Sequence, residues 1–271
     1  MNKTLYRVLR WVPSVILLGL SACANQQPKP DHTLATTSAA PNTEPKTAWG
    51  NYPPLQWHGA AKARASLLGW QSHTFASKRA TQYTAVEVDG RQALMAWAQS
   101  SVSMVRQSVR VEPSELGDIR FSWKVPALIP GADLLQRDAH DSPVRVLLVF
   151  EGNRSGFSVK NALLSELSKT LTGEDLPYAT LMYVWCNTCL AETVFVSPRT
   201  DRIREVAVQA GTDGLNRWLD YTRNVRADYE KVFGEAPGAL LGVGIMTDTD
   251  NTRQNVLAWY GAVSLTTPAV K

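Results

Sequence analysis

Hydrophobic and polar residues alternate along much of the chain beyond residue 80, which is the period-two pattern of strands with one buried face. β-Branched and aromatic residues are frequent in these runs, and they favour strand over helix. Asp89-Gly90 separates the first two runs and is a strong hairpin signal. We predict ten strands, at Tyr83–Val88, Ala93–Ala98, Val102–Val111, Ile119–Val125, Val144–Phe150, Ala179–Trp185, Thr193–Val196, Ile203–Val208, Ala239–Met246 and Leu257–Leu265.

Two segments have helical spacing instead. Val159–Leu171 places leucines three and four residues apart, and Gly173 follows it. Arg226–Phe233 is shorter, with Asn224 as a capping residue before it and Gly234 as a stop after it. Strands with a few helices in long connections, and no regular βαβ alternation, predict a mainly β fold. We expect an antiparallel β-sandwich of the jelly-roll, galactose-binding or lectin-like kind, with one or two inserted helices.

The amino end has a different pattern. Basic residues precede the apolar stretch Val12–Leu20, and the stretch ends in Leu20-Ser21-Ala22-Cys23. Its nine residues, at about 1.5 Å each in a helix, are too short to span about 30 Å of hydrocarbon. We therefore expect residues 1–22 to be a signal peptide.

This ending resembles the signal of bacterial lipoproteins. The resemblance implies lipidation of Cys23 and membrane attachment through that lipid, with Ala24 directing the protein to the outer membrane, facing the periplasm. The alternative is an ordinary secretory peptide in which Cys23 is incidental. Residues 24–48 are poor in apolar side chains, so residues 23–48 are expected to be a lipidated cysteine with a flexible tether. The folded domain is expected to cover residues 49–271.

Charge excludes one class of partner. The chain has a formal net charge of +4, and removing Lys3, Arg7 and Arg10 with the signal peptide takes three positive charges away and leaves +1. A nearly neutral chain has no electrostatic attraction to nucleic acid. We therefore expect no nucleic-acid partner.

Cys186 and Cys189 form a Cys-x-x-Cys motif directly after an apolar run. In an oxidising compartment the favoured interpretation is a disulfide across a tight turn. A redox-active pair, a metal half-site and free thiols remain as alternatives.

Asp248, Asp250 and Asn251 follow the last long apolar run within a few residues. Carboxylate and amide oxygens suit Ca²⁺, so a structural calcium ion at these three residues is one hypothesis. The stronger interpretation is a turn, because Asp and Asn bond their own backbone and initiate turns.

Acid–base chemistry has few candidates in the sequence. His140 lies between Asp138 and Asp141, either of which could orient it as a general base, although polar loops before strands are usually structural. No nucleophile motif accompanies it. A glycosidase would need two facing carboxylates, for which the possible members are Asp138, Asp141, Glu151, Asp228 and Asp248.

Tryptophan is abundant, with nine in the chain. Trp97, Trp123, Trp185 and Trp259 fall in predicted strands, and Trp49, Trp57, Trp70 and Trp218 lie nearer loops or strand edges. An exposed indole could stack on a sugar ring, whereas a buried one fills the core.

The order of several motifs resembles a family of exported bacterial proteins, the domain-of-unknown-function family 3047, over about residues 66–265. The resemblance is carried by Trp70, the Asp89-Gly90 hairpin, Phe121-Ser122-Trp123, Asp138 to Asp141, Tyr183-Val184-Trp185, Asp228-Tyr229, Phe233-Gly234, Asp248-Thr249-Asp250-Asn251-Thr252 and Trp259-Tyr260-Gly261. It implies a β-sandwich similar to galactose-binding or lectin-like domains and implies no activity.

Three functional hypotheses follow. The first is a tethered binding or scaffolding lipoprotein whose sandwich holds a glycan or an envelope protein. The second is an enzyme that cleaves glycosides of envelope polysaccharide on a lectin-like sandwich. The third, a redox accessory protein, requires an exposed and reactive Cys186.

Overall fold

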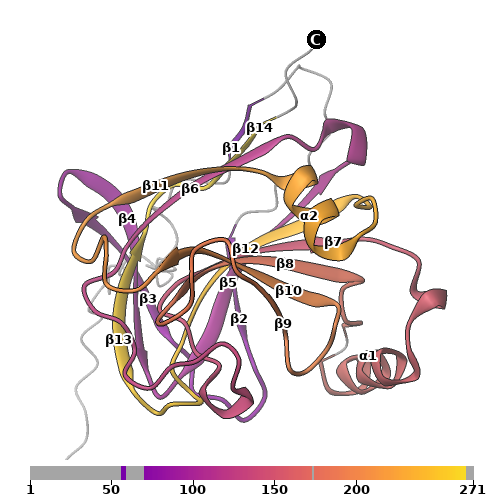
Figure 1. Cartoon of the computed structure of the whole chain (residues 1–271), viewed down its shortest axis with the longest axis horizontal. Helices are drawn as coiled ribbons and strands as arrows, with labels where there is room; N and C mark the ends of the chain where they lie inside the picture. Colours follow the sequence, from indigo (N-terminus) through magenta and orange to yellow (C-terminus); the bar gives the residue numbers. More distant parts are fainter. Residues whose placement is uncertain (1–55, 59–69, 173, 267–271) are drawn as a thin grey trace, which may run out of the picture. The chain divides into compact units, whose positions relative to one another are not determined.

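A computed structural model describes residues 56–58, 70–172 and 174–266 of the chain. Within these residues, a pair of β-sheets with seven strands each pack against one another (Figure 1). The architecture is a mainly β sandwich, as the strand pattern predicts. The signal peptide, Cys23 and the tether of residues 23–48 lie outside the described residues, and so does the expected start of the domain at residue 49. No described helix is long and apolar enough to cross a membrane.

The first sheet has the order β1-β14-β6-β13-β4-β3, with β11 paired to β6 beside this path. Asp89 and Gly90 both have positive φ, which makes the β3–β4 connection the tight hairpin that these residues predict. The strands are β1 (Gln56–His58), β3 (Gln82–Val88), β4 (Arg91–Gln99), β6 (Asp118–Lys124), β11 (Leu219–Asn224), β13 (Asn255–Tyr260) and β14 (Ser264–Thr266).

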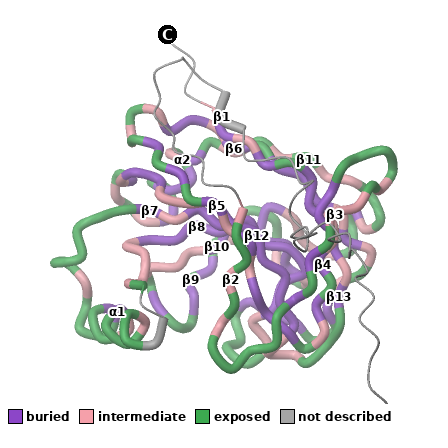
Figure 2. Tube along the Cα trace, turned by 180° about the vertical axis from the view of Figure 1, so that it is seen from behind, coloured by how far each residue is buried: buried purple, intermediate pink, exposed green. Residues whose placement is uncertain are grey.

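The second sheet has the order β2-β5-β12-β7-β8-β10-β9. Its central strands are long and almost fully buried, because one face meets the first sheet and loops cover some of the other (Figure 2). The strands are β2 (Trp70–Thr74), β5 (Val102–Val111), β7 (Arg145–Phe150), β8 (Ala179–Cys186), β9 (Val194–Val196), β10 (Ile203–Ala210) and β12 (Leu240–Asp248).

The core lies between the two sheets. Alternate residues of each strand point into it, so Val146, Leu148 and Phe150 of β7 are buried in the main apolar cluster. Trp123 and Trp185 are fully buried there, at 0% exposure, as expected for tryptophans in strands.

Both predicted helices are present. α1 (Val159–Thr172) lies in the connection between β7 and β8, and α2 (Val225–Phe233) follows β11. The Asn224 side chain accepts a hydrogen bond from the Ala227 amide, and Gly234 ends α2 in the left-handed conformation. The cap and the stop of α2 are therefore confirmed.

The structure corrects the strand prediction in three respects. β10 runs parallel to β8, whereas we expected an antiparallel sheet. After β8 the chain first forms the edge strand β9. It then returns as β10, which lies between β8 and β9 and is antiparallel to β9. The run Leu257–Leu265 is two strands, since β13 ends before Gly261, whose Cα packs against Ser122. β1, β2 and β11 were not predicted. In β2 and β11 the exposed faces are polar and the other faces carry few apolar residues.

Candidate functional site

A groove of about 710 Å³ lies on the face of the second sheet that points away from the core. Strands β5, β12, β7, β8 and β10 form its floor. Residues of the loop after β2 and His140 of the loop before β7 also line it. A second pocket, beside Phe157 and Asn161, holds about 20 Å³.

Strand register arranges the floor in three rows, because paired residues of neighbouring strands point to the same face. The rows run across the sheet from β5 through β12 and β7 to β8 and β10. The first row holds Met104, Met246 and Arg145, the second Arg106, Gly244, Leu147, Met182 and Glu205, and the third Ser108, Gly242, Val149, Thr180 and Ile203.

Arg145 is the centre of a buried ionic cluster at the end of the groove formed by the first row. Its Nη1 lies 2.9 Å from Glu205 Oε2, and its Nε donates to Asp248 Oδ1 at 3.0 Å. Its Nη2 donates to the His140 carbonyl at 3.0 Å. Arg145 and Glu205 are each 1% exposed, so this cation and two anions come from three different strands and are held out of water.

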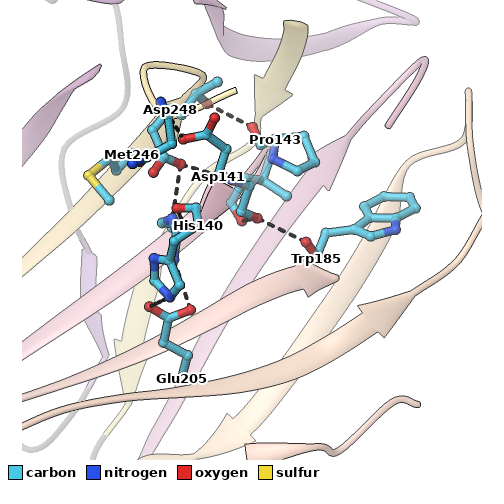
Figure 3. Close-up of polar contacts among 12 residues, drawn as sticks. His140, Asp141, Pro143, Trp185, Glu205, Met246 and Asp248 are labelled. Carbon is cyan, nitrogen blue, oxygen red and sulfur yellow. Dashed lines mark hydrogen bonds and ion pairs between the residues drawn. The ribbon is translucent and has the colours of Figure 1, made fainter. Parts of the chain in front are cut away.

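His140 extends this cluster into the groove. Its ring is directed toward the Glu205 carboxylate, with Nε2 3.3 Å from Oε1 (Figure 3). His140 Nε2, Arg145 Nη1 and Glu205 Oε2 are buried, and beyond the ion pairs within the cluster none has a further hydrogen-bond partner among the described residues. Three polar atoms at the groove floor therefore have ionic neighbours but unused hydrogen-bonding capacity.

Burial and the neighbouring charges set the protonation of the cluster. Burial raises the pKa of Asp248 to about 6, although the Arg145 guanidinium opposes this rise. Burial also lowers the pKa of His140; Glu205 works against this, and Arg145 and Arg199 add to it. Burial disfavours the charge of Arg145, but Asp248 and Glu205 outweigh it and raise the Arg145 pKa. At neutral pH His140 is therefore neutral and Arg145 charged.

Asp248, Asp250 and Asn251, the residues of the calcium hypothesis, lie at the same end of the groove. Carboxylate oxygens of Asp141, Asp248 and Asp250 lie within 4.8 Å of one another. Each already has protein partners: Asp248 binds Arg145, and Asp250 pairs with Lys78 at 2.6 Å.

Hydrogen bonds that this loop makes to Asp141 and Arg137 support its interpretation as a turn. Asp141 accepts from the amides of Asn251 and Thr252, at 3.3 and 2.7 Å, and residues 250–253 form a turn. The Asn251 side chain donates to the Arg137 carbonyl. The calcium site stays a prediction. A calcium ion there would compete with Lys78 and Arg145 for the carboxylates of Asp250 and Asp248.

The other acidic candidates do not face one another across the groove. Asp138 is exposed. Glu151 pairs with Arg110 at the surface, and Asp228 pairs with Arg223 and accepts from Tyr183. His140 contacts Glu205 and is not oriented by the Asp138 or Asp141 side chain. Glu205 comes from a distant strand, so the sequence alone could not place it beside His140.

Cys186 and Cys189 form a disulfide, which confirms the favoured interpretation. Cys186 is 4% exposed and packs in the apolar cluster beneath the groove. A bonded and buried sulfur leaves no thiolate for redox exchange or metal binding, so the redox hypothesis lacks its required exposed cysteine.

The partly exposed tryptophans lie away from the groove. Trp97, at 42% exposure, is on the outer face of the first sheet, and cross-strand pairing places Met95, Leu257 and Trp259 on that face. Trp218 lies under the guanidinium of Arg91. Among the described residues no tryptophan lines the groove, so the expected indole platform does not form its floor.

Sequence reasoning missed Arg145 and Glu205, although a signal was present. Each is a charged residue inside an apolar strand, at a position whose neighbours two residues away are apolar or small. A charge on the inward side of such a run must be paired. The pairing could not be foreseen, because β7, β10 and β12 are distant in sequence.

Comparison with known proteins gives the family. The profile described as "Protein of unknown function (DUF3047)" matches residues 68–264. The chain belongs to this family. The match covers both sheets apart from β1 and the end of β14. No curated protein matches the chain.

Several solved structures are similar to the chain. TmCBM61, in complex with β-1,4-galactotriose, has 12% identity over 72% of this chain and 86% of its own, with a TM-score of 0.29. A family 12 xyloglucanase from Bacillus licheniformis has 8% identity over 73% of this chain and 99% of its own, with a TM-score of 0.37. The xyloglucanase domain of NopAA from Sinorhizobium fredii, in complex with cellobiose, has 9% identity over 75% of this chain and 98% of its own, with a TM-score of 0.34. Likenesses this distant carry no argument about the ligand of this chain.

Proposed function

We propose that this protein is a glycan-binding β-sandwich and that the groove on the second sheet holds the sugar. The observation that carries the proposal is the buried polar cluster at the groove floor, where His140 Nε2, Arg145 Nη1 and Glu205 Oε2 have ion-pair neighbours within the cluster and no further hydrogen-bond partner among the described residues. All three residues line the groove, so a ligand in the groove lies next to this cluster.

Hydroxyl groups fit these atoms chemically. A carboxylate oxygen accepts and a guanidinium donates, and a hydroxyl can do both at once. A hydrogen bond to a charged group contributes about 1.5–3 kcal/mol, so a ligand whose hydroxyls bond several members of this cluster gains specificity as well as affinity. Sugars carry several hydroxyls on one ring, whereas an anion would meet the repulsion of Glu205. The groove volume, about 710 Å³, lies within the usual range for small-ligand sites.

Binding is supported over glycoside cleavage by the position of Arg145. Each of the five acidic residues that line the groove is paired with a basic side chain. Glu205 and Asp248, on the floor strands, both contact the guanidinium of Arg145, while Asp250, Glu174 and Asp175 pair with Lys78, Arg106 and Arg154. A glycosidase needs free space between its two carboxylates for the scissile bond or a water molecule. Here a fully buried cation contacts both floor carboxylates.

The test is glycan-array screening followed by titration calorimetry. We expect selective binding of an oligosaccharide and at least about a tenfold loss of affinity in Glu205→Gln, which removes one charge-assisted hydrogen bond. Glu230→Gln, at an exposed site on α2, is the matched control and should bind as the wild type does.

A second variant guards against loss of fold. Gly242→Ala adds a methyl group on the groove floor, where its Cβ would lie 3.4 Å from the Gln107 carbonyl oxygen, and it should also weaken binding. The proposal fails if no glycan binds, or if both groove variants keep native circular dichroism and bind as the wild type does. Release of reducing ends during these assays would favour the glycosidase hypothesis instead.

The proposal includes attachment to the outer membrane through a lipid on Cys23, with the domain facing the periplasm. Its support is the Leu20-Ser21-Ala22-Cys23 motif in the sequence. Cys23→Ser should move the protein from the membrane fraction to the soluble fraction of a cell that processes lipoproteins, whereas Cys189→Ser should not. Membrane retention of Cys23→Ser would contradict the anchor.

A further inference from the structure

The groove has a second chemical character beside its polar cluster. Met104, Met182, Met246, Leu147 and Phe75 belong to one apolar cluster and all line the groove. Met246 pairs directly with Met104 across β12 and β5, and Met182 pairs with Leu147 across β8 and β7. The apolar region is therefore continuous over four strands and adjoins Arg145 and Glu205.

Two glycines deepen this apolar region. Gly242 and Gly244 occupy alternate positions of β12 on the groove face, between β5 and β7. A Cβ at Gly244 would lie 3.3 Å from the Val105 carbonyl oxygen and 3.7 Å from Leu147 Cβ. Glycine inside a central strand gives up packing and marks a place where a ligand can approach the backbone. The result is a trough bordered by Leu147 and Val149.

The apolar lining suits flexible chains better than flat rings. Among the Phe, Tyr and Trp side chains of the described residues, Phe75 alone lines the groove. Sugar rings stack best on planar aromatic faces, which this floor does not supply. Thioether side chains are flexible and polarizable, and they adapt to ligands of irregular shape. The floor thus offers hydroxyl-binding atoms at one end and an aliphatic trough beside them.

We propose that the groove binds an amphiphile: a sugar head group whose hydroxyls contact His140, Arg145 and Glu205, joined to an alkyl or acyl chain that lies along Met104, Met246 and the glycine trough. This inference rests on the proposed glycan-binding function and names its ligand class as a glycolipid-type molecule.

The experiment compares alkyl glycosides that differ only in the chain. Binding of methyl and n-octyl β-glycosides is measured by calorimetry below the micelle concentration, in the glucose, galactose and maltose series. Each fully buried methylene strengthens binding about fourfold, so partial burial of the octyl chain should give at least about a tenfold gain over the methyl glycoside in the series that binds.

Variants separate the two ends of the ligand. Met104→Gln with Met246→Gln should reduce the octyl-to-methyl ratio to below about threefold, and Met104→Leu with Met246→Leu should retain it. Met95→Gln, on the outer face of the first sheet, is the matched control and should leave the ratio unchanged. Glu205→Gln should weaken both ligands of a series by a similar factor.

The outcomes distinguish this inference from the function on which it rests. Equal affinity of methyl and octyl glycosides overturns the amphiphile inference and leaves glycan binding standing. Binding of n-octanol as tight as that of octyl glycosides, unaffected by Glu205→Gln, overturns both. Absence of binding in all three series overturns the amphiphile inference as well.

Discussion

Arg145 is a charged residue in the interior of a buried strand. The isolated guanidinium would be costly to bury, but Glu205 and Asp248 lie 2.9 and 3.0 Å from it. Two anions around one cation compensate its charge. The raised pKa of Asp248 comes mainly from burial, and the neighbouring Asp141 carboxylate adds to it. The stability of this strand therefore depends on a pairing that spans three strands.

Arg145→Met tests this dependence. It leaves Glu205 and Asp248 buried without their cation, so we expect the free energy of unfolding to fall by about 3–5 kcal/mol in urea titrations. Lys169→Met removes an exposed pair on α1 and should cost less than about 0.5 kcal/mol. A fall of less than about 1 kcal/mol in Arg145→Met would show that the cluster is not coupled to folding.

His140 should make stability sensitive to acid. Its pKa in the folded state lies below the ordinary 6.5, mainly through burial, among Glu205, Arg145, Arg199 and Asp141. The unfolded chain therefore binds a proton more readily, and the contribution of His140 to stability is present above pH 6.5 and lost as the pH falls below it.

His140→Gln removes that titration. The unfolding free energy of the wild type minus that of His140→Gln, measured by urea unfolding at each pH, should decrease as the pH is lowered from about 8 to about 5. A difference that stays constant over this interval would contradict the assignment.

At this scale the sequence indicates some of the site. His140, Asp248 and Asp250 stand out as polar residues clustered in loops or at a strand end, and all three line the groove. Glu205 does not stand out, because its role depends on the strand that lies next to β10. Local pattern carries no information about that neighbour.

α1 is an element whose sequence pattern and packing differ. Leucine spacing correctly predicts the helix, and a helical stripe of leucines usually faces the core. Here Leu163 and Leu167 are 69% and 52% exposed, whereas Asn161 and Ser165 face inward. Asn161 bonds Thr200 and Asp201, so polar contacts hold the helix against the sheet edge.

Truncation of these leucines should therefore cost little. Leu163→Ala and Leu167→Ala should each change the free energy of unfolding by less than about 0.5 kcal/mol, because the side chains bury little surface. Leu94→Ala, at 1% exposure, should cost about 2–5 kcal/mol. Comparable losses at all three positions in chemical denaturation would mean that α1 packs through its leucines.

The loop after β12 allows a test of the calcium hypothesis. Lys78 and Arg145 already neutralise Asp250 and Asp248, so we expect millimolar Ca²⁺ or chelator to leave the melting temperature unchanged. The measurement is thermal unfolding of the wild type and Asp250→Asn. A rise in melting temperature with Ca²⁺ that Asp250→Asn abolishes would establish the ion site instead.

Strands with one clearly apolar face were predictable, and so were the edge strands β3 and β9, whereas β1, β2 and β11 were not. β5 has the bounds that alternation predicts, Val102–Val111. β11 alternates between half-buried and exposed residues, so its sequence, Leu-Asp-Tyr-Thr-Arg-Asn, has little apolar contrast. It becomes a strand because β6 supplies hydrogen-bond partners, which is a tertiary effect.

At the scale of the whole molecule, the pattern of apolar and polar residues predicted the class of fold. The same pattern did not predict the groove. Counting strands and helices suffices for a β-sandwich. The groove needs Gly242, Gly244, Leu147 and Arg106 on one face, and that placement depends on the register of β5, β12 and β7. Register is a property of paired strands and is not contained in the pattern of any one strand.

The expected domain boundary can be tested by truncation. Every residue of the described apolar clusters lies between Trp70 and Leu265, so a chain that begins at Trp49 should fold. We expect its urea midpoint to match that of the longer chain beginning at Cys23. A midpoint lower by more than the experimental error would mean that residues 23–48 contribute to the folded state.

β12 is the strand between β5 and β7, yet it begins at Leu240, more than a hundred residues after β5 ends. Until the ribosome has added residue 248, these two strands have no partner between them, and the sheet cannot close. Assembly of this half of the protein must therefore wait until β12 has been synthesised, and the high sequence separation of its contacts favours slow folding. Any premature stop before β12 removes the centre of a sheet rather than trimming its edge.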